Sequence, residues 1–479
     1  MAEPTAPRET RPVMWWAAAA CAAAAVAVFL PAVRLPFLDW DDGVNIVRNP
    51  NLNFSLGGVR WMLTGAGLGH WHPLSWFTLA LDRAVWGFRP AGFHLTNVLL
   101  HALNAALFFL LARRLLRPAG ARANRADAAA LFSALFWGLH PLRVESVAWV
   151  TERRDVLSGA LMLAAASAYV RGADEGEGSK GAFWRRAALA LGAAAMASKV
   201  FAIVLPGVFL ILDARLRVRP RWREKLPWLA PVAVALGFNL AAQAQGAAVS
   251  WAAFGLQARL AQAAYGLAFY AGKTLWPSGL GPLYERSLLL EPAPFIAAAV
   301  VVIAAAGSLW TWRRRFPGLA QAALAYALLA LPALGLFKSG RMIAADRYAY
   351  LPGLPLALLA GAALARAPFI GAARAAAAAV LVACALLARA QLPVWSSDVA
   401  LWTRACEVSP LSYFARLKLS SAEAAAGLPV QAASDHAAAA RLHAEVFTRA
   451  AEVHAARGDA AAASAARARV EQGLQLIVP

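Results

Sequence analysis

The chain has 479 residues, of which 61% are hydrophobic and 15% are charged, and its mean hydropathy is +0.54. This composition excludes an ordinary soluble globular protein. The formal net charge of +20 would suit a nucleic-acid-binding protein. However, the basic residues gather in short loops between apolar segments and form no basic stripe with interleaved aromatic residues. We therefore expect membrane lipids, and no nucleic acid, among the partners of this chain.

Apolar segments long enough to cross a bilayer recur along most of the chain. They are continuous rather than alternating, which predicts spanning helices and an all-α polytopic membrane protein. The first segment contains A-x-A patterns typical of a signal-peptide cleavage site, but we interpret it as an uncleaved anchor. The predicted spans, about eleven in number, are 14–33, 95–115, 126–141, 155–170, 186–198, 200–214, 227–245, 295–312, 319–337, 350–366 and 373–393.

The basic loops also predict how these spans are oriented, because short cytoplasmic loops are enriched in Lys and Arg. They place the start of the chain in the cytoplasm and its other end on the external side. Segment 258–276 is apolar too, but counting it as a span would move the three arginines at 313–315 to the external side. We therefore interpret it as an interfacial or re-entrant helix.

Two parts of the chain lie outside the predicted spans. Residues 34–94 form a large first external loop, whose aromatic-rich helical stretch is expected to lie along the membrane surface. Residues 395–479 form a small helical tail that follows the membrane domain, residues 1–394. The tail resembles fragments of tetratricopeptide repeats around Leu401–Trp402 and Gly458–Asp459, whereas generic helical hairpins fit the same pattern.

Three carboxylates, Asp39, Asp41 and Asp42, fall within four positions directly after the first apolar segment. Just beyond the hydrocarbon edge, a carboxylate can stay ionised and still reach a lipid head group. The cluster therefore indicates a candidate chemical site. The alternative is a solvated loop in which the carboxylates stabilise turns and cap helices.

A set of cations breaks the positive-inside pattern, because it falls on the external side or near the outer ends of spans. Charged residues at membrane depth need partners and mark candidate functional sites. Internal partners are available in Glu145, Glu152, Asp155 and Asp346. A ligand with a negative head group, such as a lipid phosphate, is the other candidate. The set comprises Arg143, Arg153, Arg154, Lys199, Lys273, Lys338, Arg341 and Arg347.

The acidic cluster and these cations together suggest a single-displacement glycosyl transfer. In a polyprenyl-phosphate sugar, the cleavable bond joins the anomeric carbon to the phosphate at the membrane surface. A carboxylate can deprotonate an acceptor hydroxyl as that hydroxyl attacks the carbon, and Arg or Lys can stabilise the departing phosphate. Inversion at the anomeric carbon is expected.

A series of short polar and aromatic motifs follows in order over residues 35–415. The strongest runs from His140 to Trp149 and continues through residues 153–157. The other stretches are 37–42 with Asn45 and 49–50, 71–75, 90–97 with 100–101, 198–199, 273–279 and 345–352. Together these motifs resemble the transmembrane and tetratricopeptide-repeat O-mannosyltransferases of the GT-C glycosyltransferase superfamily.

This resemblance implies a GT-C membrane fold in the inner membrane of a bacterium, with the active site and the tail on the periplasmic side. It implies a polyprenyl-phosphate sugar as donor and a protein or glycolipid as hydroxyl acceptor. Asp41 and Asp42 are then the catalytic acids, with Asp41 as the base. The residues expected to bind the substrate or the donor phosphate are Arg347, Lys199, Arg154, Arg153, Tyr350, His140, Glu145 and Asp155.

The chain departs from the family pattern at two places. Arg154 stands where bacterial relatives are commonly lysine-like, which keeps the charge but changes how a phosphate would be held. The tail carries at most one or two degenerate repeats, so the mode of acceptor recognition is left open.

We expect no cofactor and no metal site. A phosphate-binding glycine loop is absent from the sequence, which argues against a nucleotide-sugar donor or an ATP-driven pump. His140 and Glu145 are five positions apart and therefore do not share a helical face, and no third ligand accompanies them. A divalent Mg or Mn site is the alternative, since related enzymes differ in their need for one.

Two other classes of protein are alternatives to a glycosyltransferase. A transporter or flippase of a lipid-linked sugar would need a polar pathway through both leaflets, whereas the polar intramembrane residues here gather on one side. A non-catalytic membrane scaffold would need a longer helical-repeat array than this tail offers.

Overall fold

The computed structural model describes residues 14–117, 123–216, 218, 222–244, 255–287, 289–336, 342–368 and 370–473. Two of the predicted external cations, Lys338 and Arg341, lie outside these residues. The described chain is almost entirely helical, as predicted, and one short antiparallel pair of strands joins β1 (Tyr284–Glu285) to β2 (Met342–Ala344). A helix lies at every predicted span, because each segment is apolar over several turns.

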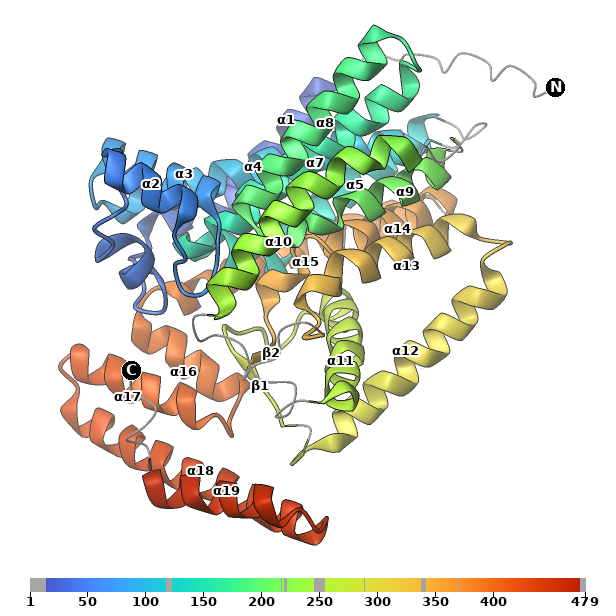
Figure 1. Cartoon of the computed structure of the whole chain (residues 1–479). Helices are drawn as coiled ribbons and strands as arrows, with labels where there is room; N and C mark the ends of the chain where they lie inside the picture. Colours follow the sequence, from blue (N-terminus) through green and yellow to red (C-terminus); the bar gives the residue numbers. More distant parts are fainter. Residues whose placement is uncertain are drawn as a thin grey trace.

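Most of the apolar helices lie together in a main bundle (Figure 1). They are α1 (Trp15–Phe29), α4 (Pro90–Leu115), α5 (Ala123–Leu139), α7 (Arg153–Asp174), α8 (Ser179–Ser198), α9 (Leu205–Leu216), α10 (Leu229–Ala244), α13 (Pro317–Ala330), α14 (Gly353–Arg366) and α15 (Ile370–Gln391). The others are α2 (Leu56–Thr64), α3 (Pro73–Trp86), α6 (Val144–Ala148), α11 (Leu256–Leu275), α12 (Pro292–Trp312), α16 (Asp398–Val408), α17 (Tyr413–Ala425), α18 (Pro429–Ala456) and α19 (Ala460–Gln472).

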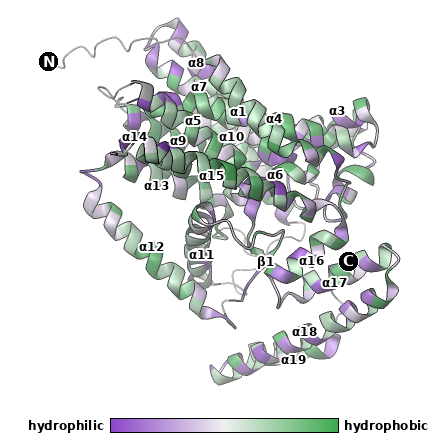
Figure 2. Ribbon diagram, turned by 180° about the vertical axis from the view of Figure 1, so that it is seen from behind, coloured by the Kyte–Doolittle hydropathy of each residue, from purple (hydrophilic) through white to green (hydrophobic). Residues whose placement is uncertain are grey.

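The apolar helices present a surface that is suited to lipid. Among the described residues, six helices are long and apolar enough to cross a membrane. One of them, α12, exposes Val300, Val301 and Ile303, each by more than half. Figure 2 shows apolar residues along the bundle helices, whereas α16–α19 carry a mixture of polar and apolar residues. The chain is therefore a multi-pass membrane protein, while the number of eleven spans stays a prediction.

A row of polar side chains on α4 forms hydrogen bonds to the segments that follow α5 and β2. Asn97, His101 and Asn104 are four and three positions apart, so they share one face of the helix, and all three are buried. Asn97 donates to the carbonyl oxygens of Val147, in α6, and Trp149, directly after it. His101 and Asn104 bind the hydroxyl of Tyr350. These bonds fix the loops that follow α5 and β2 relative to the membrane helices.

The first hairpin of the tail packs into the same hydrophobic core as the bundle. Trp395, Leu401, Trp402 and Leu419 belong to the cluster that also contains α1, α4 and α7 residues. In contrast, α18 and α19 lie outside this core, beyond α17 (Figure 1). The division between a membrane domain and a tail at residue 395 stays a prediction, but α16 and α17 are packed as part of the larger unit.

The predicted orientation has a direct test. An odd number of spans after a cytoplasmic start places residues 395–479 in the periplasm. A reporter that is active only in the periplasm, fused after Pro479, is therefore expected to be active. Activity of a cytoplasmic reporter at the same position would show that the span count is wrong by one, most directly at α11.

Candidate active site

The acidic loop, residues 39–42, follows α1. Its two adjacent aspartates, Asp41 and Asp42, lie in different environments. Asp42 is 1% exposed, and its carboxylate accepts bonds from the backbone amides of Leu38 (3.1 Å) and Thr151 (2.9 Å) and from the Thr151 hydroxyl (2.7 Å). Burial raises the pKa of Asp42 to about 7, although these bonds oppose the shift. Asp42 therefore fixes the acidic loop to the turn before α7, and its role as a catalytic acid stays a prediction.

The side chain of Asp41 is half-buried, so it is more accessible than that of Asp42. Among the described residues, none donates a hydrogen bond to its carboxylate. Burial raises the pKa of Asp41 above its ordinary value, and the positive charges of Arg154 and Arg347 act in the opposite direction. A carboxylate with this environment can accept a proton from a substrate.

Three of the predicted cations converge from separate parts of the chain, and two of them, Arg154 and Arg347, lie close enough to Asp41 to lower its pKa. Arg154 lies in the first turn of α7, Lys199 directly follows α8, and Arg347 follows β2 in a short 3₁₀ turn, Asp346–Ala349. Because α7 and α8 pack together as consecutive helices joined by a short turn, the start of α7 lies beside the end of α8. The short β-pair then brings Arg347 to the same place.

The three cations share one carboxylate, that of Glu152, which was not predicted as a site residue from the sequence. Glu152 has a fully buried side chain, and one of its oxygens, Oε1, is 2.5 Å from Arg154 Nη2 and 3.2 Å from Arg347 Nε. Its other oxygen is 3.3 Å from Lys199 Nζ. Glu152 was visible in the sequence only as one of several carboxylates interleaved with the cations.

Two further carboxylates complete the cluster. Glu145 pairs with the guanidinium of Arg347 and accepts the backbone amide of the same residue at 2.8 Å. Asp155 pairs with Lys199 and accepts the hydroxyl of Ser146 at 3.1 Å. Five of the predicted donor-site residues, namely Arg347, Lys199, Arg154, Glu145 and Asp155, are therefore brought together.

Three predicted donor-site residues are placed elsewhere. The Arg153 guanidinium is fully buried against Asp82 at 2.6 Å, because neighbours on a helix point about 100° apart and Arg154 takes the direction toward the site. The ring nitrogens of His140 contact the backbone of Thr274 and of its own turn, and the Tyr350 hydroxyl is bound inside the bundle. These three side chains contact other parts of the fold rather than the cluster around Glu152, and their contact with the donor stays a prediction.

Asp346, one of the four candidate internal partners, does not pair with the neighbouring Arg347, which contacts Glu145 and Glu152 instead. It accepts the Tyr284 hydroxyl at 2.7 Å and the amide of Gly281 at 3.2 Å. Burial raises the pKa of Asp346 to about 8. The bond from Tyr284 joins β1 to the turn that follows β2 and contains Arg347.

Aromatic rings connect the acidic loop to the tail. Trp40 lies between Trp149, at 4.9 Å between ring centroids, and Trp402 of α16, at 5.1 Å. The amide of Asp39 donates to Asp398 at 2.8 Å, at the start of the same helix. Helix α16 thus holds the acidic loop in place, a contact between residues too distant in the chain for sequence patterns to reveal.

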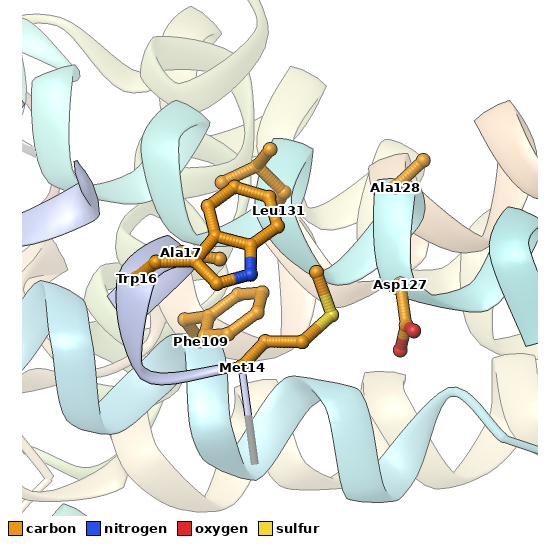
Figure 3. Close-up of a pocket in the computed structure, with 7 residues that line it drawn as sticks. All are labelled: Met14, Trp16, Ala17, Phe109, Asp127, Ala128 and Leu131. Carbon is orange, nitrogen blue, oxygen red and sulfur yellow. The ribbon is translucent and has the colours of Figure 1, made fainter. Parts of the chain in front are cut away.

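A separate pocket of about 290 Å³ lies at the other end of α1, lined mainly by apolar residues of α1, α4 and α5 (Figure 3). Its one carboxylate, Asp127, is paired with Arg113 at 2.8 Å. The 15 residues of α1 place the pocket about 22 Å from the acidic loop. It therefore does not belong to the candidate active site.

Among the described residues, no three His, Cys, Asp or Glu side chains gather in a way that could hold a metal ion. The cluster around Glu152 interleaves carboxylates with cations, which is a poor donor set for a divalent cation. The need for a cofactor stays untested.

Comparison with known proteins gives one consistent group of relatives. The chain is 29% identical to human "Protein O-mannosyl-transferase TMTC4" over 217 residues, which cover 42% of this chain and 29% of that protein. It is 31% identical to Drosophila melanogaster "Protein O-mannosyl-transferase Tmtc1" over 162 residues, covering 32% and 18%. The resemblance to the protein O-mannosyl-transferases is confirmed. The aligned part spans less than a third of the length of these relatives, and no model of a protein family matches.

Two solved structures of ArnT from Cupriavidus metallidurans are also similar. The structure bound to undecaprenyl phosphate has a TM-score of 0.43 at 17% identity and covers 89% of this chain and 75% of that one. The apo structure has a TM-score of 0.44 at 16% identity and covers 90% and 79%.

Proposed function

We propose that this protein is a membrane glycosyltransferase that moves a sugar from a polyprenyl-phosphate donor to a hydroxyl of a protein or glycolipid. The reaction takes place on the periplasmic face of a bacterial inner membrane. The observation that carries the proposal is the proximity of Asp41, which accepts no hydrogen bond from a described residue, to Arg154 and Arg347, which converge with Lys199 on Glu152. Similarity to the protein O-mannosyl-transferases supports the same chemistry.

In the proposed reaction, Asp41 accepts the proton of the acceptor hydroxyl as its oxygen attacks the anomeric carbon. The new carbon–oxygen bond forms on the face opposite the phosphate, and the bond from that carbon to the phosphate oxygen breaks, so the configuration inverts. The electron pair leaves with the polyprenyl phosphate. The cations beside Asp41 stabilise the charge that develops on that phosphate.

The cations keep hydrogen-bond donors for a phosphate even while they are paired. Arg154 uses Nε and Nη2 on Glu152, which leaves its second terminal nitrogen. Among the described residues, the Nη2 of Arg347 contacts the Met342 sulfur at 3.4 Å and the Tyr348 hydroxyl at 3.5 Å, which are weak partners. Each guanidinium can therefore contact a phosphate without first breaking all of its ion pairs.

The raised pKa of Asp41 predicts the direction of the pH dependence. Only the ionised form can act as base, and burial shifts the pKa upward from about 3.9, the value for an exposed aspartate. As the pH falls, Asp41 is therefore protonated earlier than an exposed aspartate, and kcat/KM is expected to fall with it. A profile of kcat/KM against pH that stays flat down to about pH 4, with the protein still folded, would contradict this assignment.

The proposal is tested in cells by comparing a strain that carries the gene with a strain from which it is deleted. Intact-mass measurement of envelope proteins and glycolipids is expected to show a species heavier by one hexose unit that is lost on deletion. The Asp41→Asn gene is expected not to restore it. An unchanged set of envelope glycans, with the protein present in the membrane of the first strain, would contradict the proposal.

A transporter of lipid-linked sugars is the alternative function. The described ionisable residues around Asp41 gather at one end of α7, which agrees better with chemistry at one membrane face than with a polar path through both leaflets. A flippase would change where the lipid-linked sugar lies and would leave the sugar attached to it.

A further inference from the structure

Glu152 differs from the other carboxylates of the site in the number of cations that it contacts. Both Arg154 and Arg347 approach its Oε1, and Lys199 approaches its Oε2. These three cations belong to three different segments of the chain, and their charged groups turn inward toward one buried side chain. Convergence of two guanidiniums and an ammonium on a single small anion is the arrangement that suits a phosphate.

The neighbouring carboxylates have more restricted contacts. Glu145 binds the side chain and the backbone of Arg347 and so holds that residue in place. Asp155 contacts Lys199 among the cations and is also held by Ser146. Among the described residues, Glu152 is thus the single carboxylate that all three cations share.

The charge of the ion-paired cluster limits its attraction for a second anion. Three cations face three ion-paired carboxylates, so these six groups are neutral together when all are ionised, and Asp41 adds a negative charge near Arg154 and Arg347. A neutral cluster of this kind attracts a phosphate only through those donors that its own carboxylates leave unused. Glu152 therefore keeps the cations in position and at the same time competes for them.

We propose that Glu152 is a resident anion that takes the place of the donor phosphate in the empty site and yields part of its ion pairs when the lipid phosphate binds. This inference rests on the proposed function. After sugar transfer, the return of Glu152 to the cations weakens their hold on the polyprenyl phosphate and so favours its release. Glu152 is accordingly a positioning residue that sets the balance between binding of the donor and release of the lipid product.

The test replaces Glu152 by glutamine, which keeps the shape of the side chain and removes its charge. Binding of undecaprenyl phosphate to the purified full chain in detergent is measured for the native protein and for Glu152→Gln. We expect the variant to bind at least about 10-fold more tightly and to show lower kcat together with lower KM for the donor. A merely structural role would lower stability and weaken binding.

Asp155→Asn is the matched control, because it removes one negative charge from the same cluster but contacts one cation only. It is expected to tighten binding of undecaprenyl phosphate less than Glu152→Gln does. Equal tightening by both variants would assign the effect to net charge alone and would overturn the specific role of Glu152.

Glu152→Asp covers the case in which the glutamine variant does not fold. It keeps the charge but withdraws the carboxylate by one methylene group, so it is expected to bind undecaprenyl phosphate more tightly than the native protein. If the native protein binds undecaprenyl phosphate and the folded variants bind it with unchanged or weaker affinity, this inference is overturned and the proposed function is not. No binding by the native protein or by any variant overturns the proposed function together with it.

Discussion

Replacing Asp41 by asparagine is expected to lower turnover by about 10²- to 10⁴-fold, because the amide has nearly the same shape but cannot accept the acceptor proton as a base. The melting temperature should change little, since no described residue donates a hydrogen bond to the Asp41 carboxylate. Sugar transfer by the purified variant and its thermal unfolding are the two measurements.

Asp42→Asn is the matched control one position away. Its amide group would place a donor against the backbone amide of Leu38, where the carboxylate now accepts a bond. This variant is therefore expected to lose melting temperature, whereas Asp41→Asn loses rate. Near-normal turnover of Asp41→Asn would remove Asp41 from the role of base and point to Asp42 or Asp39.

Replacing Arg347 by alanine is expected to lower kcat/KM by about 10²- to 10³-fold and to weaken donor binding at the same time. Both effects follow because the phosphate is charged in the ground state and in the transition state. The change also leaves the Glu145 carboxylate, which is 2% exposed, without its cation, so some loss of stability accompanies it. Arg347→Lys should recover only part of the activity, since the charge returns without the two-pronged geometry.

Arg48→Ala serves as the control for Arg347→Ala. Arg48 pairs with Asp39 of the acidic loop, but this pair is exposed, with side-chain accessibilities of 63% and 65%. Its loss is expected to leave donor affinity unchanged. If Arg347→Ala also keeps native affinity for undecaprenyl phosphate while remaining folded, Arg347 does not bind the donor phosphate, and its pairs with Glu145 and Glu152 are structural.

Much of this fold could be predicted from the sequence, because lipid imposes a simple pattern on it. Apolar stretches of about 20 residues can only be helices in a bilayer, and a helix lies at every predicted span. The cations Arg154, Lys199 and Arg347 were recognisable because they break the positive-inside pattern. These predictions depend on local composition, which a single sequence displays directly.

The rest of the site depends on directions and long-range contacts that a sequence does not display. Arg153 and Arg154 are adjacent and chemically identical, yet one faces Asp82 and the other faces Glu152. Only the position of neighbouring helices decides which of them reaches the site. The central position of Glu152 is hidden for the same reason, since Lys199 and Arg347 are far from it in the chain.

The packing of the tail, residues 395–479, could also not be predicted from the sequence. Apolar residues such as Leu401 and Trp402 fit a repeat fragment, a separate hairpin or an extension of the membrane domain equally well. In the structure, Trp402 packs against Trp40, and Asp398 accepts the amide of Asp39. Packing of this kind places α16 beside the acidic loop, a placement that no pattern within residues 395–479 could indicate.

The most direct test of the proposed chemistry follows a labelled sugar. The purified protein is incubated with polyprenyl phosphate carrying the labelled sugar, mannose first, and with envelope proteins and glycolipids from the deletion strain. We predict that the label moves to a protein or glycolipid, that free polyprenyl phosphate appears in equal amount, and that Asp41→Asn abolishes both. A label that stays on the lipid while the protein carries that lipid across a proteoliposome bilayer would contradict glycosyl transfer and establish transport instead.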